Sequence, residues 1–295
     1  MPTGLAQRLR SLPRRRKAQH AAAPQRAVAL DKLKAAPGDH GAHIAPVVQG
    51  NDGRVHTVSV SNRAIMFECP NEVSFGRAKW LLQKEPGTIA WLDTFAPGSV
   101  FWDIGANIGV YALYAAIVRH CNVLAFEPTA PNYYGLNRNI TLNKVDRHVR
   151  AYCVALDDKC SLDAMQMHDD IIGTALHAFS VPIDYKGDRF QPAWQQGALA
   201  LSIDTLVSQF SAPFPSYIKV DVDGLEVAVI QGGRETFADP RFKSVLVEVN
   251  LADEPEVTSI SSILEAAGLS RDDTLAGNVE RKLEGARIFN LVYRR

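Results

Sequence analysis

The chain has 295 residues, of which 46% are hydrophobic and 22% charged, so it can bury the core of one large domain or of two. Its formal net charge is zero, but residues 1–34 hold nine Lys or Arg and one acid, a balance of +8 that leaves −8 for the rest. This acidic body argues against a nucleic-acid-binding domain, so we expect no nucleic-acid partner. No run of 18 apolar residues predicts a transmembrane helix.

Residues 1–50 are rich in Ala, Arg, Pro and Gly, which predicts a basic, disordered tail that at most contacts an acidic surface weakly. The tail lacks the apolar stretch of a secretory signal, although its Arg-rich, acid-poor composition also fits a mitochondrial presequence. Four cysteines show no C-x-x-C spacing, and Cys121 and Cys153 stand in apolar contexts that predict buried thiols. We therefore expect no zinc site and a reducing, cytoplasmic environment.

Residues 51–98 predict a hairpin and two helices that pack on the core that follows. Alternating apolar residues from 55 to 67 flank Ser61-Asn62-Arg63, which is typical of a β-hairpin. Helices are predicted over residues 71–82 and 88–95, with Thr88 as the N-cap of the second.

The best-defined motif is a strand, a glycine turn and a helix. Residues 100–102 are apolar and predict a short buried strand that ends at Asp103. Residues 105–109 (G-A-N-I-G) predict a tight turn, and residues 110–118 an apolar helix. This order is the entry to a nucleotide-binding α/β unit. Because a pyrophosphate prefers a helix N-terminus without nearby negative charge, Asp103 favours a ligand with a cationic head, such as the amino acid part of S-adenosylmethionine.

The next two predicted strands also end in acids. Residues 122–126 form the second strand, and Glu127 follows it, 24 residues after Asp103, where an acid accepts both ribose hydroxyls. The alternative role for Glu127 is to cap the next helix, predicted over residues 131–143. The third strand, 149–156, ends at Asp157, which either accepts from the exocyclic amine of adenine or belongs to a plain turn.

Residues 159–202 are a long insertion, which we interpret as a β-rich lid over the site. Three more helices are predicted: over 203–210, from residue 226 to the Gly232-Gly233 pair, and over 259–267. Three more strands are predicted over 217–222, 244–249 and 287–293, and the last of them is expected to be antiparallel. Strands that alternate with helices predict a doubly wound, Rossmann-like α/β sheet within a domain from 99 to 295.

Polar residues converge at the carboxyl ends of these strands, where doubly wound sheets bind ligands. They are Asp103, Glu127, Asp157, Asp221, Asp223, Glu248 and Asn250. We hypothesise that Asp221 and Glu248 orient or deprotonate a hydroxyl acceptor, with Asp223 in support. Acids this close are also a candidate site for Mg²⁺ or Ca²⁺. The alternative is that Asp223 and Glu226 only cap the next helix.

Several motifs in order resemble the FkbM family of S-adenosylmethionine-dependent methyltransferases, over roughly residues 73–250. They are D-I-G-A-N-I-G (103–109), A-F-E-P (125–128), N-x-x-L-N (139–143) and I-K-V-D-V-D-G-L-E (218–226), with K-E-P-G-T-I-A-W (84–91) and L-V-E-V-N (246–250). The resemblance implies the class I methyltransferase fold and O-methylation of a small molecule or saccharide. Many relatives have Glu where this chain has Asp223, and some have His where it has Asn250, so the most obvious general base is missing.

The resemblance and the strand ends together give the expected site. The expected cofactor-binding residues are Glu85, Thr88, Asp103, Gly105, Ala106, Asn107, Gly109, Glu127, Asp157 and Asp221, and the expected catalytic residues are Asp221, Asp223, Glu248 and Asn250. Two other functions stay open: a non-catalytic module of the same fold docked by its basic tail, and an NAD-dependent oxidoreductase. The missing third glycine of G-x-G-x-x-G and the acidic turn count against the oxidoreductase.

Overall fold

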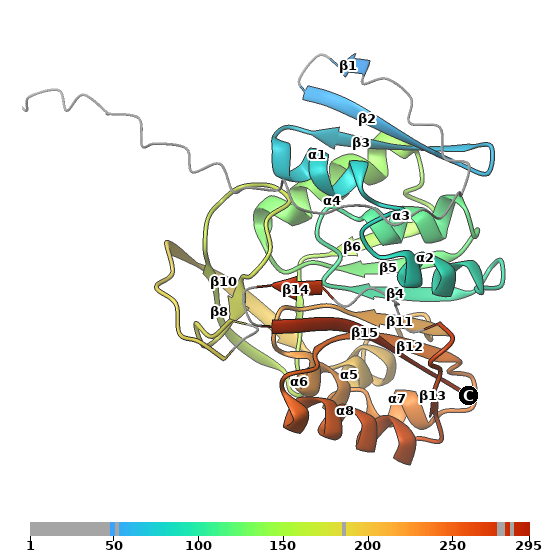
Figure 1. Ribbon diagram of the computed structural model, residues 1–295, viewed down its shortest axis with the longest axis vertical. Coiled ribbons are helices and arrows are strands. Elements are labelled where there is room, and N and C mark those ends of the chain that lie inside the picture. Colours follow the sequence, from blue (N-terminus) through green and yellow to red (C-terminus); the bar gives the residue numbers. More distant parts are fainter. Residues whose placement is uncertain (1–47, 51–52, 185–186, 276–280, 284–285) are drawn as a thin grey trace, which may run out of the picture. The chain divides into compact units, whose positions relative to one another are not determined.

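The computed structural model describes residues 48–295 except 51–52, 185–186, 276–280 and 284–285 (Figure 1). The predicted tail therefore lies outside the described residues up to position 47. At the end of that range, Val48–Gly50 form strand β1, which pairs antiparallel with β2 (Gly53–Val60). No described helix is long and apolar enough to cross a membrane.

The centre of the fold is a mixed sheet with the strand order β13-β15-β12-β11-β4-β5-β6. Its parallel strands are β4 (Val100–Ile104), β5 (Asn122–Phe126), β6 (Val149–Tyr152), β11 (Tyr217–Val220) and β12 (Ser244–Asn250). Strand β15 (Ala286–Arg294) runs antiparallel to β12, and β13 (Ser270–Arg271) and β14 (Arg281–Leu283) pair with β15. Within this sheet the chain enters at the central strand β4, continues through β5 to the edge strand β6, and then returns to β11 on the other side of β4. The predicted doubly wound α/β sheet is confirmed.

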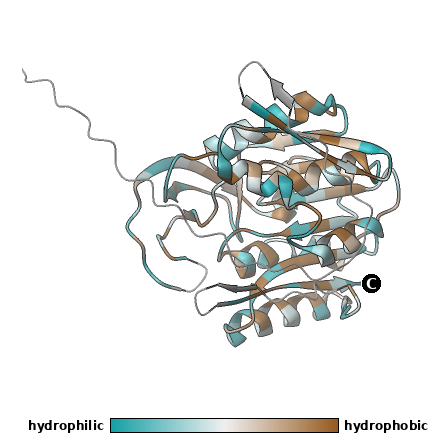
Figure 2. Cartoon of the chain, turned by 45° about the horizontal axis from the view of Figure 1, so that its top comes forward, coloured by the Kyte–Doolittle hydropathy of each residue, from teal (hydrophilic) through white to brown (hydrophobic). Residues whose placement is uncertain are grey.

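Helices cover both faces of this sheet. One face carries α1 (Glu72–Lys79), α2 (Pro86–Asp93), α3 (Val110–Ile117), α4 (Ala130–Asn143) and the hairpin of β2 (Gly53–Val60) and β3 (Arg63–Cys69) (Figure 1). The other face carries α5 (Ile203–Ser208), α6 (Glu226–Gln231), α7 (Arg234–Ala238) and α8 (Glu254–Ala266). Figure 2 shows apolar residues along the strands between these two layers.

The period-two alternation of the strands decides which face each side chain reaches. On β4, Phe101 packs in the core under α1 to α4, while Trp102 and Ile104 pack in the core under α5 to α8. Asp103 therefore shares a face with Phe101. On β11, Lys219 shares this face with Tyr217. The face shared by α2 and α3 thus carries charged side chains at the carboxyl ends of the central strands.

The insertion forms a second sheet beside the first, in the order β7-β10-β8-β9. Its strands are β7 (Ala155–Leu156), β8 (Ser161–Met167), β9 (Ala178–Phe179) and β10 (Trp194–Leu201). The single strand predicted over 149–156 is wrong, because the chain leaves the central sheet after Tyr152 and Ala155 pairs with Ala200 of β10 instead. The β-rich character predicted for the insertion is present.

Several predicted boundaries also change. Helix α2 begins at Pro86, so Thr88 lies inside it and Glu85 occupies the N-cap position without a side-chain capping bond. Helix α8 begins at Glu254, five residues before the predicted start at 259, because Asp253 caps it by accepting from the Glu256 amide.

The predicted end of a helix at Gly232-Gly233 is confirmed, because α6 ends at Gln231 with Gly232 as its C-cap. The pair separates α6 from α7, a helix that was not predicted. Cys153 is exposed rather than buried, because the chain has left the central sheet there, whereas Cys121 is buried as predicted.

Candidate active site

The glycine turn and the segment after β11 are in direct contact. Gly105 has φ +81°, and a Cβ built on it would lie 1.8 Å from the backbone oxygen of Asp221. The amide of Asp221 donates to the oxygen of Ile104 at 3.1 Å. Only a residue without a side chain permits this approach. The motif at 103–109 and the motif at 218–226 therefore form one site.

Asp103 lies at the base of this turn with 1% of its surface exposed. Neither carboxylate oxygen has a hydrogen-bond partner among the described residues. Burial raises the pKa of Asp103 to about 6, against the opposing effect of Lys219. A buried carboxylate with unused acceptors is costly unless a donor or a cation reaches it. The site is therefore suited to a ligand with a cationic amino group.

Glu127 is also buried, but its oxygens have protein donors. One oxygen accepts from the Asn107 amide at 2.8 Å, and the other accepts from the amide and hydroxyl of Thr129 at 2.9 and 2.5 Å. Thr129 is the N-cap residue of α4, so these contacts match the capping alternative. Glu127 thereby holds the glycine turn against the start of α4, and its contact with a ribose stays a prediction.

An apolar pocket opens at the carboxyl ends of β4 and β5, beside Gly105. Its lining includes Phe126 and Leu156, and the insertion adds Met165, His177 and Phe179. The cavity measures only about 30 Å³, so its apolar walls would have to move apart to take up a flat, weakly polar ring. Asp157 is not among the lining residues, and its carboxylate accepts from the Asp158 amide at 2.8 Å. A contact of Asp157 with adenine stays a prediction.

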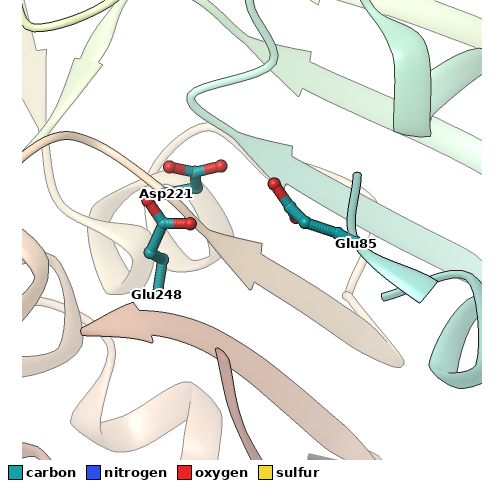
Figure 3. A group of neighbouring side chains, drawn as sticks. All are labelled: Glu85, Asp221 and Glu248. Atoms are coloured by element: carbon teal, nitrogen blue, oxygen red, sulfur yellow. The ribbon is translucent and has the colours of Figure 1, made fainter. Parts of the chain in front are cut away.

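Three carboxylates converge on the other side of the turn. Glu85, Asp221 and Glu248 come from the residue before α2, the end of β11 and β12, and they point toward one another (Figure 3). Carboxylate oxygens from all three lie within 4.8 Å of one another. Asp221 also pairs with the Lys219 ammonium at 2.5 Å. Burial would raise the pKa of Asp221, but the Lys219 charge outweighs it, and the pKa is lowered.

Thr88 and Asn290 hold the Glu85 carboxylate of this cluster in place. The Thr88 hydroxyl donates to Glu85 at 3.1 Å. The Asn290 amide donates to Glu85 at 3.3 Å and to Thr88 at 3.0 Å. Asn290 stands opposite Glu248 in the pairing of β15 with β12. The structure therefore places the predicted cofactor residues Glu85 and Thr88 beside Asp221 and Glu248.

Two predicted catalytic residues are held by other segments. Asp223 has the left-handed φ of 59°, and its carboxylate accepts from the Leu176 amide of the insertion at 2.7 Å. Burial and then the nearby Asp221 charge raise the pKa of Asp223. The Asn250 side-chain oxygen accepts from the amides of Ala252 and Arg287 at 3.1 and 3.0 Å, which fixes the start of β15. Both contacts are structural, and catalytic roles for the two residues stay predictions.

Glu226 does not cap α6, because that helix begins at Glu226 itself and has no side-chain capping bond. Its carboxylate accepts from the amides of Val222 and Gly224 at 3.0 and 2.9 Å. Burial raises the pKa of Glu226 to about 8.

Two parts of the site were not predicted from the sequence. Lys219 lies two residues before Asp221 on the same face of β11, and a lysine inside an apolar strand was the available signal. The other part is the loop of the insertion near Thr174, whose backbone oxygen accepts from Asn107 at 2.8 Å and from Asn132 at 3.0 Å. No local pattern joins positions that far apart in the chain.

The doubly wound sheet with an antiparallel β15, and a glycine turn that follows β4, give the chain the Rossmann-like fold of class I methyltransferases. The model of the Methyltransferase FkbM domain matches residues 103–271, which is more than half of the chain. The chain belongs to the FkbM methyltransferase family. The oxidoreductase alternative is thereby set aside.

Other comparisons give more distant likenesses. Hexuronic acid methyltransferase AglP of Haloferax volcanii is 24% identical over 231 residues, 77% of this chain and 87% of that protein. Among solved structures, P. horikoshii TYW2 in complex with MeSAdo has a TM-score of 0.43 and 14% identity, covering 83% of this chain and 72% of its own. A precorrin-6y C5,15-methyltransferase from Geobacter metallireducens GS-15 has a TM-score of 0.39 and 13% identity, with 70% and 88% covered.

The residues present fit S-adenosylmethionine, the methyl donor of this class. The Asp103 carboxylate, buried and without a donor, suits the amino group of its methionine part. The pocket beside Gly105 offers apolar walls for its adenine ring, provided that the pocket widens. Both features lie at the carboxyl end of β4, on the two sides of the glycine turn.

Proposed function

We propose that the protein transfers a methyl group from S-adenosylmethionine to a hydroxyl group of a saccharide or another small hydroxylated molecule. The observation that carries this proposal is the contact between Gly105 and Asp221, which joins the cofactor turn to a cluster of carboxylates. A hydroxyl acceptor needs groups that orient its O–H and take its proton. A hexuronic acid methyltransferase is among the proteins similar to this chain, which supports a saccharide acceptor.

When bound, the cofactor supplies an electrophilic methyl group and leaves as a neutral thioether. Asp103 holds the amino group of the cofactor, and the pocket lined by Phe126 and Leu156 holds its adenine. The protein then has mainly to place the acceptor oxygen in line with the methyl group.

The two central acids have different roles in this proposal. Because Lys219 keeps the pKa of Asp221 low, Asp221 is a weak base, and it orients the acceptor by accepting a hydrogen bond. Glu248 lies within the same group of carboxylates and takes the proton as the C–O bond forms. Asp223 supports the site by fixing the insertion beside it.

The test is methyl transfer by the full chain at saturating S-adenosylmethionine, with a panel of neutral hexosides and hexuronic acids as acceptors. We expect Asp221→Asn and Glu248→Gln to lower kcat about 10²-fold or more, the usual size of such effects. Asp146→Asn is the control, because this acid is exposed in the loop after α4. Wild-type turnover in both site variants would contradict the proposal. Binding of S-adenosylhomocysteine without turnover on any acceptor would favour the non-catalytic alternative.

A further inference from the structure

Lys219 is a fully buried cation in the middle of the site. Only 1% of its surface is exposed, and it lies on the central strand β11. Its ammonium is 2.5 Å from Asp221 and 5.0 Å from the centre of the Tyr111 ring on α3. A lysine is almost never buried unless it is paired, because loss of water around the charge is costly. The cost must be offset by the groups that surround it.

Three acids act on Lys219. Asp103 stands directly opposite on β4, Asp221 directly follows β11, and Glu85 precedes α2. Burial alone would lower the pKa of Lys219, but the charges of these three acids outweigh it and raise the pKa. The ammonium therefore stays charged inside the protein.

Two further charged groups, Glu127 and Lys84, act on the carboxylates of Asp103 and Asp221. Glu127 at the end of β5 opposes ionisation of Asp103, and Lys84 favours ionisation of Asp221. Lys84 is 40% exposed, so solvent screens it more than Lys219. Lys219 is thus the buried cation on which both acids depend.

Lys219 stands between the two halves of the site. Asp103 belongs to the proposed cofactor half, whereas Asp221 and Glu85 belong to the carboxylate cluster with Glu248. Buried acids this close repel one another and take up protons unless a positive charge lies between them. We propose that Lys219 is a positioning residue, whose ammonium holds Asp103 and Asp221 in their charged forms so that cofactor and acceptor bind side by side. This inference rests on the proposed function.

The proposal explains why the lysine and aspartate are two residues apart in I-K-V-D-V-D-G. Residues two apart on a strand point to the same face, so the ammonium reaches the carboxylate of its own strand. Asp103 faces the same ammonium because β4 and β11 are parallel and pair Asp103 with Lys219. The sheet register itself therefore sets the charge of the site.

The experiment compares Lys219→Met with Lys219→Arg and the control Lys243→Met in the full chain. Lys243 is exposed near the start of β12 and lies over the Tyr217 ring, away from the site. Binding of S-adenosylhomocysteine is measured by calorimetry from pH 5 to pH 9, which requires no turnover. In Lys219→Met we expect the acidic midpoint of binding to move up by about one pH unit or more. Lys219→Arg and Lys243→Met should keep the wild-type midpoint.

Turnover of the same variants gives a second readout. The acid limb of the kcat profile should move in the same direction in Lys219→Met, since Asp221 also loses its counter-ion. A folded Lys219→Met protein with wild-type binding and kcat profiles would overturn the proposal.

If Lys219→Met fails to fold, the double variant Lys219→Met with Asp221→Asn removes both charges together. Its binding midpoint should still move up, by less than in the single variant, because Lys219 acts on Asp103 more strongly than Asp221 does. An unchanged midpoint in the folded double variant would also overturn the proposal. If no acceptor is methylated, the proposed function fails while the binding curves still decide the role of Lys219.

Discussion

A Cβ on Gly105 would stand 1.8 Å from the backbone oxygen of Asp221, which is far inside any permitted contact. These two residues belong to motifs more than a hundred positions apart in the chain. Their contact brings the turn that we assign to the cofactor against the strand end that we assign to the acceptor. Any side chain at position 105 must push the two halves of the site apart.

We therefore expect Gly105→Ala to lose binding of S-adenosylhomocysteine and to cost several kcal/mol of folding free energy, roughly 3 or more, through overpacking and strain. Gly98→Ala is the matched control. Gly98 has a similar φ of +79°, but no atom lies within 4 Å of its added Cβ. The control should cost only about 1 kcal/mol from the left-handed backbone. Thermal unfolding and calorimetry of both variants make the comparison, and equal losses would show that the contact with Asp221 is unimportant.

Asp103 gives a prediction about pH. Burial raises the pKa of Asp103 to about 6 from the ordinary 3.8, so the folded protein holds this proton more tightly than the unfolded chain. Stability contributed by this group is then full below about pH 4 and is lost as the pH rises through 6. Asp103→Asn should match the wild type at low pH and exceed it in stability by up to about 3 kcal/mol at pH 8. Unfolding by urea at both pH values measures the difference.

The same variant must lose ligand affinity. Because an amide carries no charge, Asp103→Asn should bind S-adenosylhomocysteine at least tenfold more weakly than the wild type at pH 8. A variant that is less stable than the wild type at pH 8 but binds normally would show that Asp103 has a structural role only.

The sequence predicted the parts of the site that depend on local pattern. An apolar strand that ends in Asp103, followed by a glycine turn, is visible in a dozen residues. The strand end at Asp221 and Asp223 is equally local. The contact of Glu127 with Thr129 is local and was foreseen as the capping alternative, whereas its contact with Asn107 becomes apparent only when β4 and β5 pair. The break of the predicted third strand depends on its pairing with β10, forty-five residues later, where Ala155 meets Ala200.

Metal removal tests whether the carboxylate cluster needs a divalent cation, the alternative raised by its composition. The Lys219 ammonium already contacts one Asp221 oxygen at 2.5 Å and supplies positive charge to the cluster. We therefore expect dialysis against EDTA to leave kcat within about twofold, whereas a site that needs a metal would lose far more. The measurement is turnover before and after dialysis. Activity that disappears and returns with Mg²⁺, Ca²⁺ or Mn²⁺ would show that the cluster binds a cation.

The last prediction concerns the attachment of the insertion to the site. The Asn132 side chain on α4 accepts from the Gly173 amide at 2.7 Å and donates to the Thr174 oxygen at 3.0 Å. This pair of bonds holds the loop against Asn107 of the glycine turn. Asn132 is 2% exposed, so Asn132→Ala leaves the buried Gly173 amide without this partner, at about 1–3 kcal/mol, while the Thr174 oxygen keeps its bond from Asn107.

We expect Asn132→Ala to raise hydrogen exchange across residues 171–177 and to weaken S-adenosylhomocysteine binding about tenfold or more. Asn137→Ala is the control on the same helix, because the Asn137 amide donates only to the Tyr133 oxygen of α4 itself, at 2.8 Å. Exchange in the loop should stay at the wild-type rate in the control, since no bond to the insertion is lost. If Asn132→Ala leaves both exchange and binding unchanged, the insertion is held by other contacts and does not depend on this residue. A rise in exchange with normal binding would instead show that the loop is dispensable for the cofactor.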